Sequence, residues 1–177
     1  MVTMRQAPVP TATATHTTIA SRLGDLTVVA RAGAVTGLYF PHHWYLPDEA
    51  SFGDRNDAWF HDVRDQLAGY LAGGRRRFDV PVRARGDEFQ ERVWDLVSRI
   101  PYGETVTYGE LARDLADGST AQQVGAAVGR NPVCILIPCH RVVGAGGKLT
   151  GFAGGLRRKR FLLDMERDVA RPPSRLF

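Results

Sequence analysis

The chain has 177 residues, of which 44% are hydrophobic and 24% charged, and its formal net charge is +4. This length suits one domain or two small ones and allows a buried core without disulfides or metal. No run of about 18 apolar residues could cross a bilayer. The first 18 residues lack the apolar centre of a secretory signal. We therefore expect a cytoplasmic protein with no membrane contact.

Positive charge is concentrated in the second half of the chain. Residues 1–88 carry ten basic and ten acidic side chains, whereas residues 89–177 carry thirteen and nine. An asymmetry of this sign is typical of a half that binds a polyanion, although four charges make a weak signal by themselves.

The first half predicts a small α/β domain over residues 17–85. Residues 1–16 are rich in Pro, Thr and Ala, which indicates a disordered tail. Hydrophobic periodicity then predicts strands over 18–20, 26–30 and 35–40 in a small antiparallel sheet, a helix over 57–71 and a further strand over 78–82. The triplet Arg75–Arg77 could bind nucleic acid, but its place between a helix end and a strand favours a solvated loop.

The second half predicts a helical domain over residues 86–170, followed by a short tail, 171–177. Helices are expected over Asp87–Arg99, Thr107–Leu115 and Ala121–Gly129, the last capped by Ser119 or Thr120. The last two helices flank a tight turn, as in a helix-turn-helix. Small residues on the outer face of the last helix, Ala121, Gly125 and Ala126, allow close approach to a DNA groove. They equally allow tight packing against another helix, and the pattern leaves both open.

Two cysteines lie close together in the second half, Cys134 and Cys139. Their spacing matches neither a disulfide framework nor a zinc site. Cys139 directly precedes His140 and Arg141, which could supply the base and the positive charge that ionise a thiol. A buried, unreactive cysteine beside a satisfied core histidine fits the same adjacency.

Blocks of residues around Cys139 resemble the O6-alkylguanine-DNA alkyltransferase family, also called methylated-DNA–protein-cysteine methyltransferases. The blocks are Phe89-Gln90 with Val93-Trp94, Pro101–Gly103, Thr107–Ala112, Asn131-Pro132, Pro138–Val142, Gly151–Leu156 and Leu162–Glu166. Together they span 78 residues. The resemblance implies an α/β (α+β) protein: an N-terminal ribonuclease H-like domain of a small antiparallel sheet plus a helix, and a C-terminal helical domain with a winged-helix-like helix-turn-helix.

The resemblance implies a DNA repair protein that acts once. The Cys139 thiolate would take the alkyl or methyl group irreversibly from O6-alkylguanine, and from O4-alkylthymine, after the nucleotide is flipped out of the duplex. His140 would accept the thiol proton through an ordered water, and Glu166 would orient His140. Asn131 would stabilise the turn before the cysteine segment, and Tyr108 would donate a hydrogen bond to guanine N3. No cofactor is needed.

The resemblance also assigns residues that contact the base and the DNA. The backbone at Val142 would accept from the exocyclic amine and that at Ala153 would donate to O6, while Phe152 and Gly154 complete the base site. Expected DNA contacts are Ala121, Gln122, Gly125, Ala126 and Arg130, on a helix that approaches the minor groove. Gln122 stands where relatives usually have an arginine that fills the gap left by the flipped base, so Gln123 or Arg130 could share that task.

The expected partner is double-stranded DNA containing alkylated guanine, bound by a monomer, with cooperative binding left open. The zinc site of some relatives cannot form, because both cysteines lie in the acceptor segment, so no metal is expected. The main alternative is a non-catalytic alkyltransferase-like or regulatory DNA-binding protein, which would not need Cys139. A cysteine hydrolase is disfavoured because adjacent side chains on an extended segment point to opposite sides.

Overall fold

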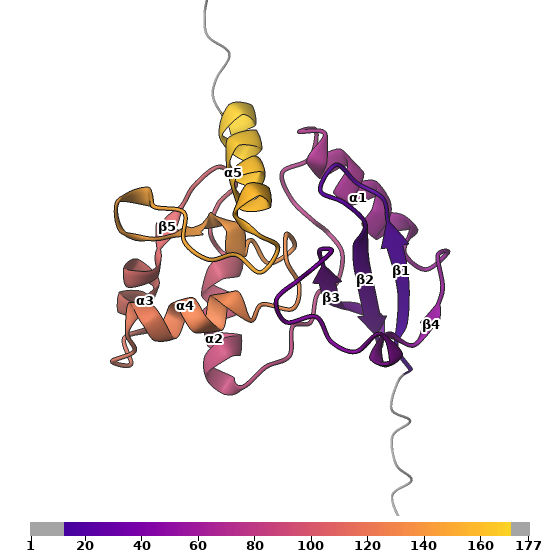
Figure 1. The fold of residues 1–177 in the computed structure, drawn as a ribbon, viewed down its shortest axis with the longest axis horizontal. Coiled ribbons are helices and arrows are strands. Elements are labelled where there is room, and N and C mark those ends of the chain that lie inside the picture. The colour runs from indigo at the N-terminus through magenta and orange to yellow at the C-terminus, as the bar shows by residue number, and fades with distance from the viewer. Residues whose placement is uncertain (1–12, 171–177) are drawn as a thin grey trace, which may run out of the picture.

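The computed structural model describes residues 13–170. Most of the expected N-terminal tail and all of the expected C-terminal tail, 171–177, lie outside the described residues. Figure 1 shows a small sheet that packs with a helix, beside a cluster of helices, which confirms the predicted mixed α/β class. Within the described part of the chain, no helix is long and apolar enough to span a bilayer.

The sheet of the first half has four strands in the order β3-β2-β1-β4. Its strands are β1 (Thr15–Ile19), β2 (Leu26–Arg31), β3 (Ala34–Tyr39) and β4 (Asp54–Arg55). β1, β2 and β3 are antiparallel neighbours, as expected, while β4 runs parallel to β1. Thr15 and His16, assigned from sequence to the tail, form the start of β1. Gly24 and Gly33 lie in the two hairpin turns with positive φ, which glycine adopts without strain.

Helix α1 (His61–Leu71) packs on this sheet through Val63, Leu67, Tyr70 and Leu71. It starts four residues later than the periodicity predicts and ends where predicted. The strand expected over residues 78–82 is wrong: only a single bridge forms there, between Val35 and Val82. Pro81 lies in this segment and has no N–H to donate to a sheet ladder. Arg75–Arg77 forms no regular structure, as the loop interpretation predicts.

As far as residue 170, where the described part ends, the second half contains four α-helices and a two-stranded parallel sheet. Its elements are α2 (Glu88–Ser98), β5 (Val106–Thr107), α3 (Tyr108–Leu115), α4 (Ala121–Gly129), β6 (Val142–Val143) and α5 (Leu156–Ala170). Capping boxes begin α2, α3 and α4, from Asp87, Thr107 and Thr120, and they satisfy backbone N–H groups that a helix start leaves unpaired. Thr120, not Ser119, therefore caps α4.

One hydrophobic core spans both halves of the chain. β3 lies at the edge of its sheet nearest the helices (Figure 1), and the Leu38 amide donates to the Pro132 carbonyl at 2.8 Å. This bond joins the sheet to the segment that leads to Cys139. The first half thus forms a support behind the segment that carries the predicted chemistry.

Candidate active site

A tightly held loop presents Cys139. Cys139–Arg141 is a short 3₁₀ turn that leads into β6. Upstream, the Asn131 side chain closes the loop from both ends, because Nδ2 donates to the Ile137 carbonyl at 3.0 Å and Oδ1 accepts from the Val133 amide at 2.9 Å. Ile135 within this loop has a φ of 71°, which a β-branched residue rarely adopts. Asn131 thus offsets local strain and places Cys139.

His140 is fully buried beside Cys139 and pairs with Glu166 on α5. Its Nε2 lies 2.9 Å from Glu166 Oε1 and 3.2 Å from the Tyr70 hydroxyl on α1. Nδ1 is buried and has no hydrogen-bond partner within residues 13–170. Burial lowers the pKa of His140, so the ring is neutral near pH 7. With Nε2–H donated to Glu166, Nδ1 carries a free lone pair that can accept a proton.

Glu166 is the centre of a buried charge network. Arg141 donates to it through Nε at 2.9 Å and Nη2 at 2.8 Å, and the Gly103 amide donates to Oε2 at 3.1 Å. Tyr70 donates to Oε1 as well. Burial alone would raise the pKa of Glu166, but hydrogen bonds from His140 and Arg141 outweigh it and hold that pKa well below its usual range. Glu166 is therefore ionised at neutral pH.

The Cys139 thiol lies in surroundings that favour the thiolate. Contact with the Cys134 thiol lowers the pKa of Cys139 and outweighs burial, which acts in the opposite direction; the Asn131 side chain and the positive charge of Lys159 also lower it. Lys159 on α5 is fully buried and donates from Nζ to the carbonyls of Thr150 and Gly151. Burial lowers the pKa of Lys159 to about 8, so this amine is mostly charged at pH 7.

Cys139 opens onto a cavity of about 60 Å³ between the two halves. The lining residues are Trp44, Tyr108, Gly125, Val128, Gly129, Cys139, Gly151, Phe152 and Ala153. Tyr108 begins α3 and donates its hydroxyl to the Thr150 carbonyl at 3.2 Å. Trp44 comes from the loop after β3, and its amide donates to the Ala153 carbonyl at 3.2 Å. The Trp44 side chain is 62% exposed, so this wall borders solvent.

The outer face of α4 is open to solvent beside this cavity. Ala121, Gln122 and Ala126 are exposed. Gln123 Oε1 accepts a hydrogen bond from the Thr120 amide at 2.8 Å, so the Gln123 side chain is held in the capping box. Arg130 follows α4, and its guanidinium lies 4.6 Å from the ring centroid of Tyr45.

Two of the expected base-contacting residues lie outside the cavity lining. Val142 is buried in β6, where it pairs with Val106 of β5. Gly154 packs under Phe40, and a Cβ at this position would lie only 2.3 Å from the Phe40 ring. Gly154 thus has a packing reason for being glycine that does not involve a substrate.

Sequence reasoning missed four residues that complete the site: Trp44, Tyr70, Lys159, and Arg141 as the partner of Glu166. Lys159 and Glu166 are seven residues apart, which places both on one face of a helix. Tyr70 lies on the apolar face of a predicted helix, where a buried hydroxyl needs a partner. The sequence therefore contained evidence for Lys159 and Tyr70. It contained none for Trp44, whose contacts are long-range and produce no local pattern.

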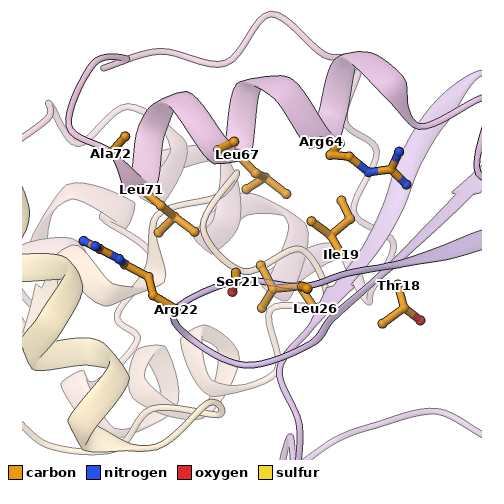
Figure 2. Close-up of a pocket in the computed structure, with 11 residues that line it drawn as sticks. Thr18, Ile19, Ser21, Arg22, Leu26, Arg64, Leu67, Leu71 and Ala72 are labelled. Carbon is orange, nitrogen blue, oxygen red and sulfur yellow. The ribbon is translucent and has the colours of Figure 1, made fainter.

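A separate cavity of about 440 Å³ lies in the first half, between the β1–β2 hairpin and α1. Ile19, Leu67 and Leu71 line its apolar wall, with Arg22 and Arg64 at its edge (Figure 2). Among the described residues, no cysteine, histidine or carboxylate lines it, so its lining differs chemically from that of the cavity at Cys139.

An α/β support, a cysteine that favours ionisation, a buried histidine–carboxylate pair and an exposed helix of small residues fit the class of group-transfer enzymes. Residues 15–84 match the family described as "6-O-methylguanine DNA methyltransferase, ribonuclease-like domain", and residues 88–168 match its "DNA binding domain". The chain belongs to the 6-O-methylguanine DNA methyltransferase family. This confirms the predicted enzyme class, methylated-DNA–protein-cysteine methyltransferase.

Individual relatives agree with this assignment. The methylated-DNA–protein-cysteine methyltransferase of Mycobacterium tuberculosis is 43% identical over 92% of this chain and 98% of its own length. That of Methanosarcina acetivorans is 49% identical over 63% of this chain and 71% of its own. The crystal structure of Mycobacterium tuberculosis OGT in complex with DNA superposes with a TM-score of 0.83 at 43% identity, covering 88% of this chain and 94% of that one.

Proposed function

We propose that this protein binds duplex DNA containing O6-alkylguanine and transfers the alkyl group irreversibly to Cys139, once per molecule. The observation that carries the proposal is the position of Cys139, which lines a cavity and directly precedes His140, the histidine of a buried His140–Glu166 pair. O4-alkylthymine, which presents the same alkyl–oxygen bond, is a second substrate.

The chemistry is an in-line displacement at the alkyl carbon. His140 Nδ1 takes the thiol proton through a water, and Glu166 stabilises the imidazolium that forms. The new S–C bond forms as the C–O6 bond breaks, and the electron pair of that bond stays with guanine. The proton lost by the thiol returns through solvent to guanine N1. A thioether holds its carbon firmly, so the protein cannot act again.

The base has to leave the duplex and the cavity has to widen. The cavity of about 60 Å³ is far smaller than the roughly 300–1,000 Å³ of usual ligand sites. An entering base therefore displaces a wall, and the exposed Trp44 side chain is the wall least held by neighbours. Tyr108 then stabilises the departing guanine at N3, and Phe152 stacks on the base.

The exposed face of α4 approaches the minor groove of the DNA. Its small residues, Ala121, Gly125 and Ala126, permit close backbone approach, and the excess positive charge of the second half attracts the phosphates. Gln122 fills the gap that the flipped nucleotide leaves. We propose a cytoplasmic monomer that works without a cofactor.

The proposal is tested by mass spectrometry of the intact protein after mixing with a duplex that contains O6-methylguanine. We expect a mass increase of one methyl group, which peptide mapping places on Cys139. Cys139→Ser removes the transfer but retains binding to the duplex. Methyl on Cys134, more than one methyl per molecule, or repeated turnover contradicts the proposal.

A further inference from the structure

Cys134 is a buried thiol that the proposed chemistry leaves without a task. Its Sγ lies 3.6 Å from Cys139 Sγ, within hydrogen-bond distance for sulfur, and 3.7 Å from the Asn131 carbonyl oxygen. Cys134 is completely buried and absent from the cavity lining. Cys134 therefore cannot contact an alkylated base. It can affect the reaction only through its contact with Cys139 Sγ.

The hydrogens of this pair restrict what Cys134 can do. When Cys139 is a neutral thiol, it can donate to Cys134, and Cys134 can donate to the Asn131 carbonyl. When Cys139 ionises, the only S–H left in the pair belongs to Cys134. Rotation about one side-chain bond turns that hydrogen from a neutral carbonyl to a thiolate, and hydrogen bonds to charged acceptors are the stronger ones.

We propose that Cys134 is a positioning residue that donates its S–H to the Cys139 thiolate and so holds the acceptor ionised and aimed at the cavity. This rests on the proposed function, in which Cys139 is the acceptor. Before Cys139 ionises, the S–H of Cys134 donates to the Asn131 carbonyl, which holds the Cys134 side chain in place.

The pKa shifts of the two thiols are consistent with Cys134 as the hydrogen-bond donor and Cys139 as the thiolate. Contact with Cys139, followed by burial and the charge of a Cys139 thiolate, raises the pKa of Cys134 well above its usual value. Contact with Cys134 is also the largest cause that lowers the pKa of Cys139. Cys139 is therefore the first of the two thiols to ionise as the pH rises, and Cys134 still carries its proton at that point.

Other ionisable groups face the pair from each element packed against it. Lys159 on α5 favours the Cys139 thiolate, and its Nζ lies 5.8 Å from the centroid of the Tyr108 ring on α3. His140 adjoins Cys139 along the chain. On the side of β3, Tyr39 faces Cys134; burial and the charge of a Cys134 thiolate raise the pKa of Tyr39 to about 12, so it stays neutral. Lys159 and His140 remain in every Cys134 variant.

Two substitutions of Cys134 separate hydrogen bonding from packing. Cys134→Ser keeps a donor of similar size, whereas Cys134→Ala removes the donor. We expect Cys134→Ala to raise the pKa of Cys139 and to reduce its thiolate fraction at neutral pH about tenfold, as loss of one hydrogen bond to a charged group allows. Cys134→Ser is expected to keep the wild-type profile.

The pH dependence of alkylation has a signature that packing cannot imitate. A thiolate of higher pKa is the better nucleophile, with a Brønsted slope of about 0.4–0.5. For Cys134→Ala we therefore expect alkylation about three- to fourfold slower than wild type at low pH and about threefold faster on the high-pH plateau. The two profiles cross. If Cys134 has only a packing role, Cys134→Ala lowers the alkylation rate at both low and high pH, or at neither.

The experiment measures iodoacetamide alkylation of Cys139 against pH, under reducing conditions, by peptide mass mapping in the full chain. Crossing profiles for Cys134→Ala, with Cys134→Ser like wild type, support the proposal. An unshifted profile for Cys134→Ala, or a Cys134→Ser profile that follows Cys134→Ala, overturns it.

A second set of data separates this proposal from the proposed function. Methyl transfer from the O6-methylguanine duplex is measured with the same variants. If wild type does not methylate Cys139, the proposed function fails, whatever the iodoacetamide profiles show. If wild type methylates Cys139 but the iodoacetamide profiles coincide, the function stands and the role of Cys134 is overturned. Should Cys134→Ala not fold, the thiolate absorbance of Cys134→Ser and Cys134→Thr tests whether a hydroxyl donor at this position preserves the wild-type pH profile. A profile unlike wild type in both variants overturns the role.

Discussion

The two sides of Cys139 are built in opposite ways. On the closed side, His140, Glu166, Arg141 and Tyr70 are buried and joined by short hydrogen bonds between α1, α5 and the acceptor turn. On the open side, the cavity is bordered by the exposed Trp44 and by a helix of small residues. In the proposed function, the closed side is in place before the substrate binds, whereas the open side changes when a base enters.

Each half of the chain contributes to both sides. The first half supplies Tyr70 to the closed side and Trp44 to the open side. It also packs behind the loop that presents Cys139. Its sheet and helix are therefore part of the site, and the following substitutions test each side separately.

The largest effect is expected from Glu166→Gln, which leaves Arg141 buried without its carboxylate. Breaking a buried ion pair by removing one partner costs about 3–5 kcal/mol of unfolding free energy. Urea unfolding measures this loss. Asp164→Asn on the same helix is the matched control, because its pair with Arg167 is about half exposed, and such pairs contribute up to about 1 kcal/mol. Equal losses in the two variants contradict a closed, charge-dependent side.

The same carboxylate gives the stability a definite pH dependence. The folded-state pKa of Glu166 lies below its usual value, so at low pH the unfolded chain binds a proton that the folded chain does not. The contribution of Glu166 is thus present above about pH 4.3, the ordinary Glu value, and is lost as the pH falls. Unfolding midpoints against pH should decline less steeply below that value in Glu166→Gln.

Tyr108→Phe tests the boundary between the two sides. The hydroxyl is held by the Thr150 carbonyl in the free protein and is expected to serve guanine N3 during transfer. We expect single-turnover transfer to slow by about 10- to 100-fold, less than for a full oxyanion donor because less charge develops at N3, with unchanged duplex affinity. Tyr102→Phe is the control, since the Tyr102 hydroxyl has no partner within residues 13–170. An unchanged rate in Tyr108→Phe removes this role.

Trp44→Ala tests whether the open side limits the size of the alkyl group. Removing this wall should raise the rate ratio of benzyl to methyl transfer by about tenfold, at the lower end of what pocket shape contributes to discrimination. Tyr45→Ala is the control, because Tyr45 is exposed but does not line the cavity. Competition between O6-benzylguanine and O6-methylguanine duplexes measures the ratio, and an unchanged ratio excludes Trp44 as the limiting wall.

The smallest effects are expected at Gln122, on the exposed face of α4. Gln122→Arg should raise duplex transfer and Gln122→Ala lower it, each by about threefold, a small part of the few kcal/mol that flipping costs. A longer planar cation fills the gap better and gains from the phosphate field. Transfer from free O6-methylguanine should not change. If Gln122→Ala matches wild type on the duplex, Gln122 does not fill the gap.

The sequence predicted the elements whose signals are local. Hydrophobic spacing, with a capping residue expected before α4, placed α2, α3 and α4 within one residue of their observed bounds, and the three antiparallel strands were recognised. Thr15 and His16 were missed because their pairing with β2 is invisible in a Thr-rich stretch. The strand predicted over residues 78–82 was wrong. The prediction relied on the apolar residues there and did not consider that Pro81 has no N–H to donate to a sheet.

The site was predictable only where chemistry lay in a short motif. Cys139 and His140 stood out as neighbours, and the family resemblance connected them to Glu166. The contact of Cys139 with Cys134 depends on the turn that Asn131 closes, and that of Trp44 with the cavity depends on packing between the two halves. Such contacts follow from the folded geometry and have no signature at fixed sequence spacing.

The most direct test of the central claim, a closed proton-accepting side and an open base-accepting side at one cysteine, is a crystal structure of Cys139→Ser bound to a duplex containing O6-methylguanine. We expect the modified base outside the stack, between Tyr108 and Phe152, with Trp44 displaced and the His140–Glu166 pair unmoved. A base that remains stacked in the duplex, or a base seated in the cavity with the His140–Glu166 pair rearranged, would contradict the claim.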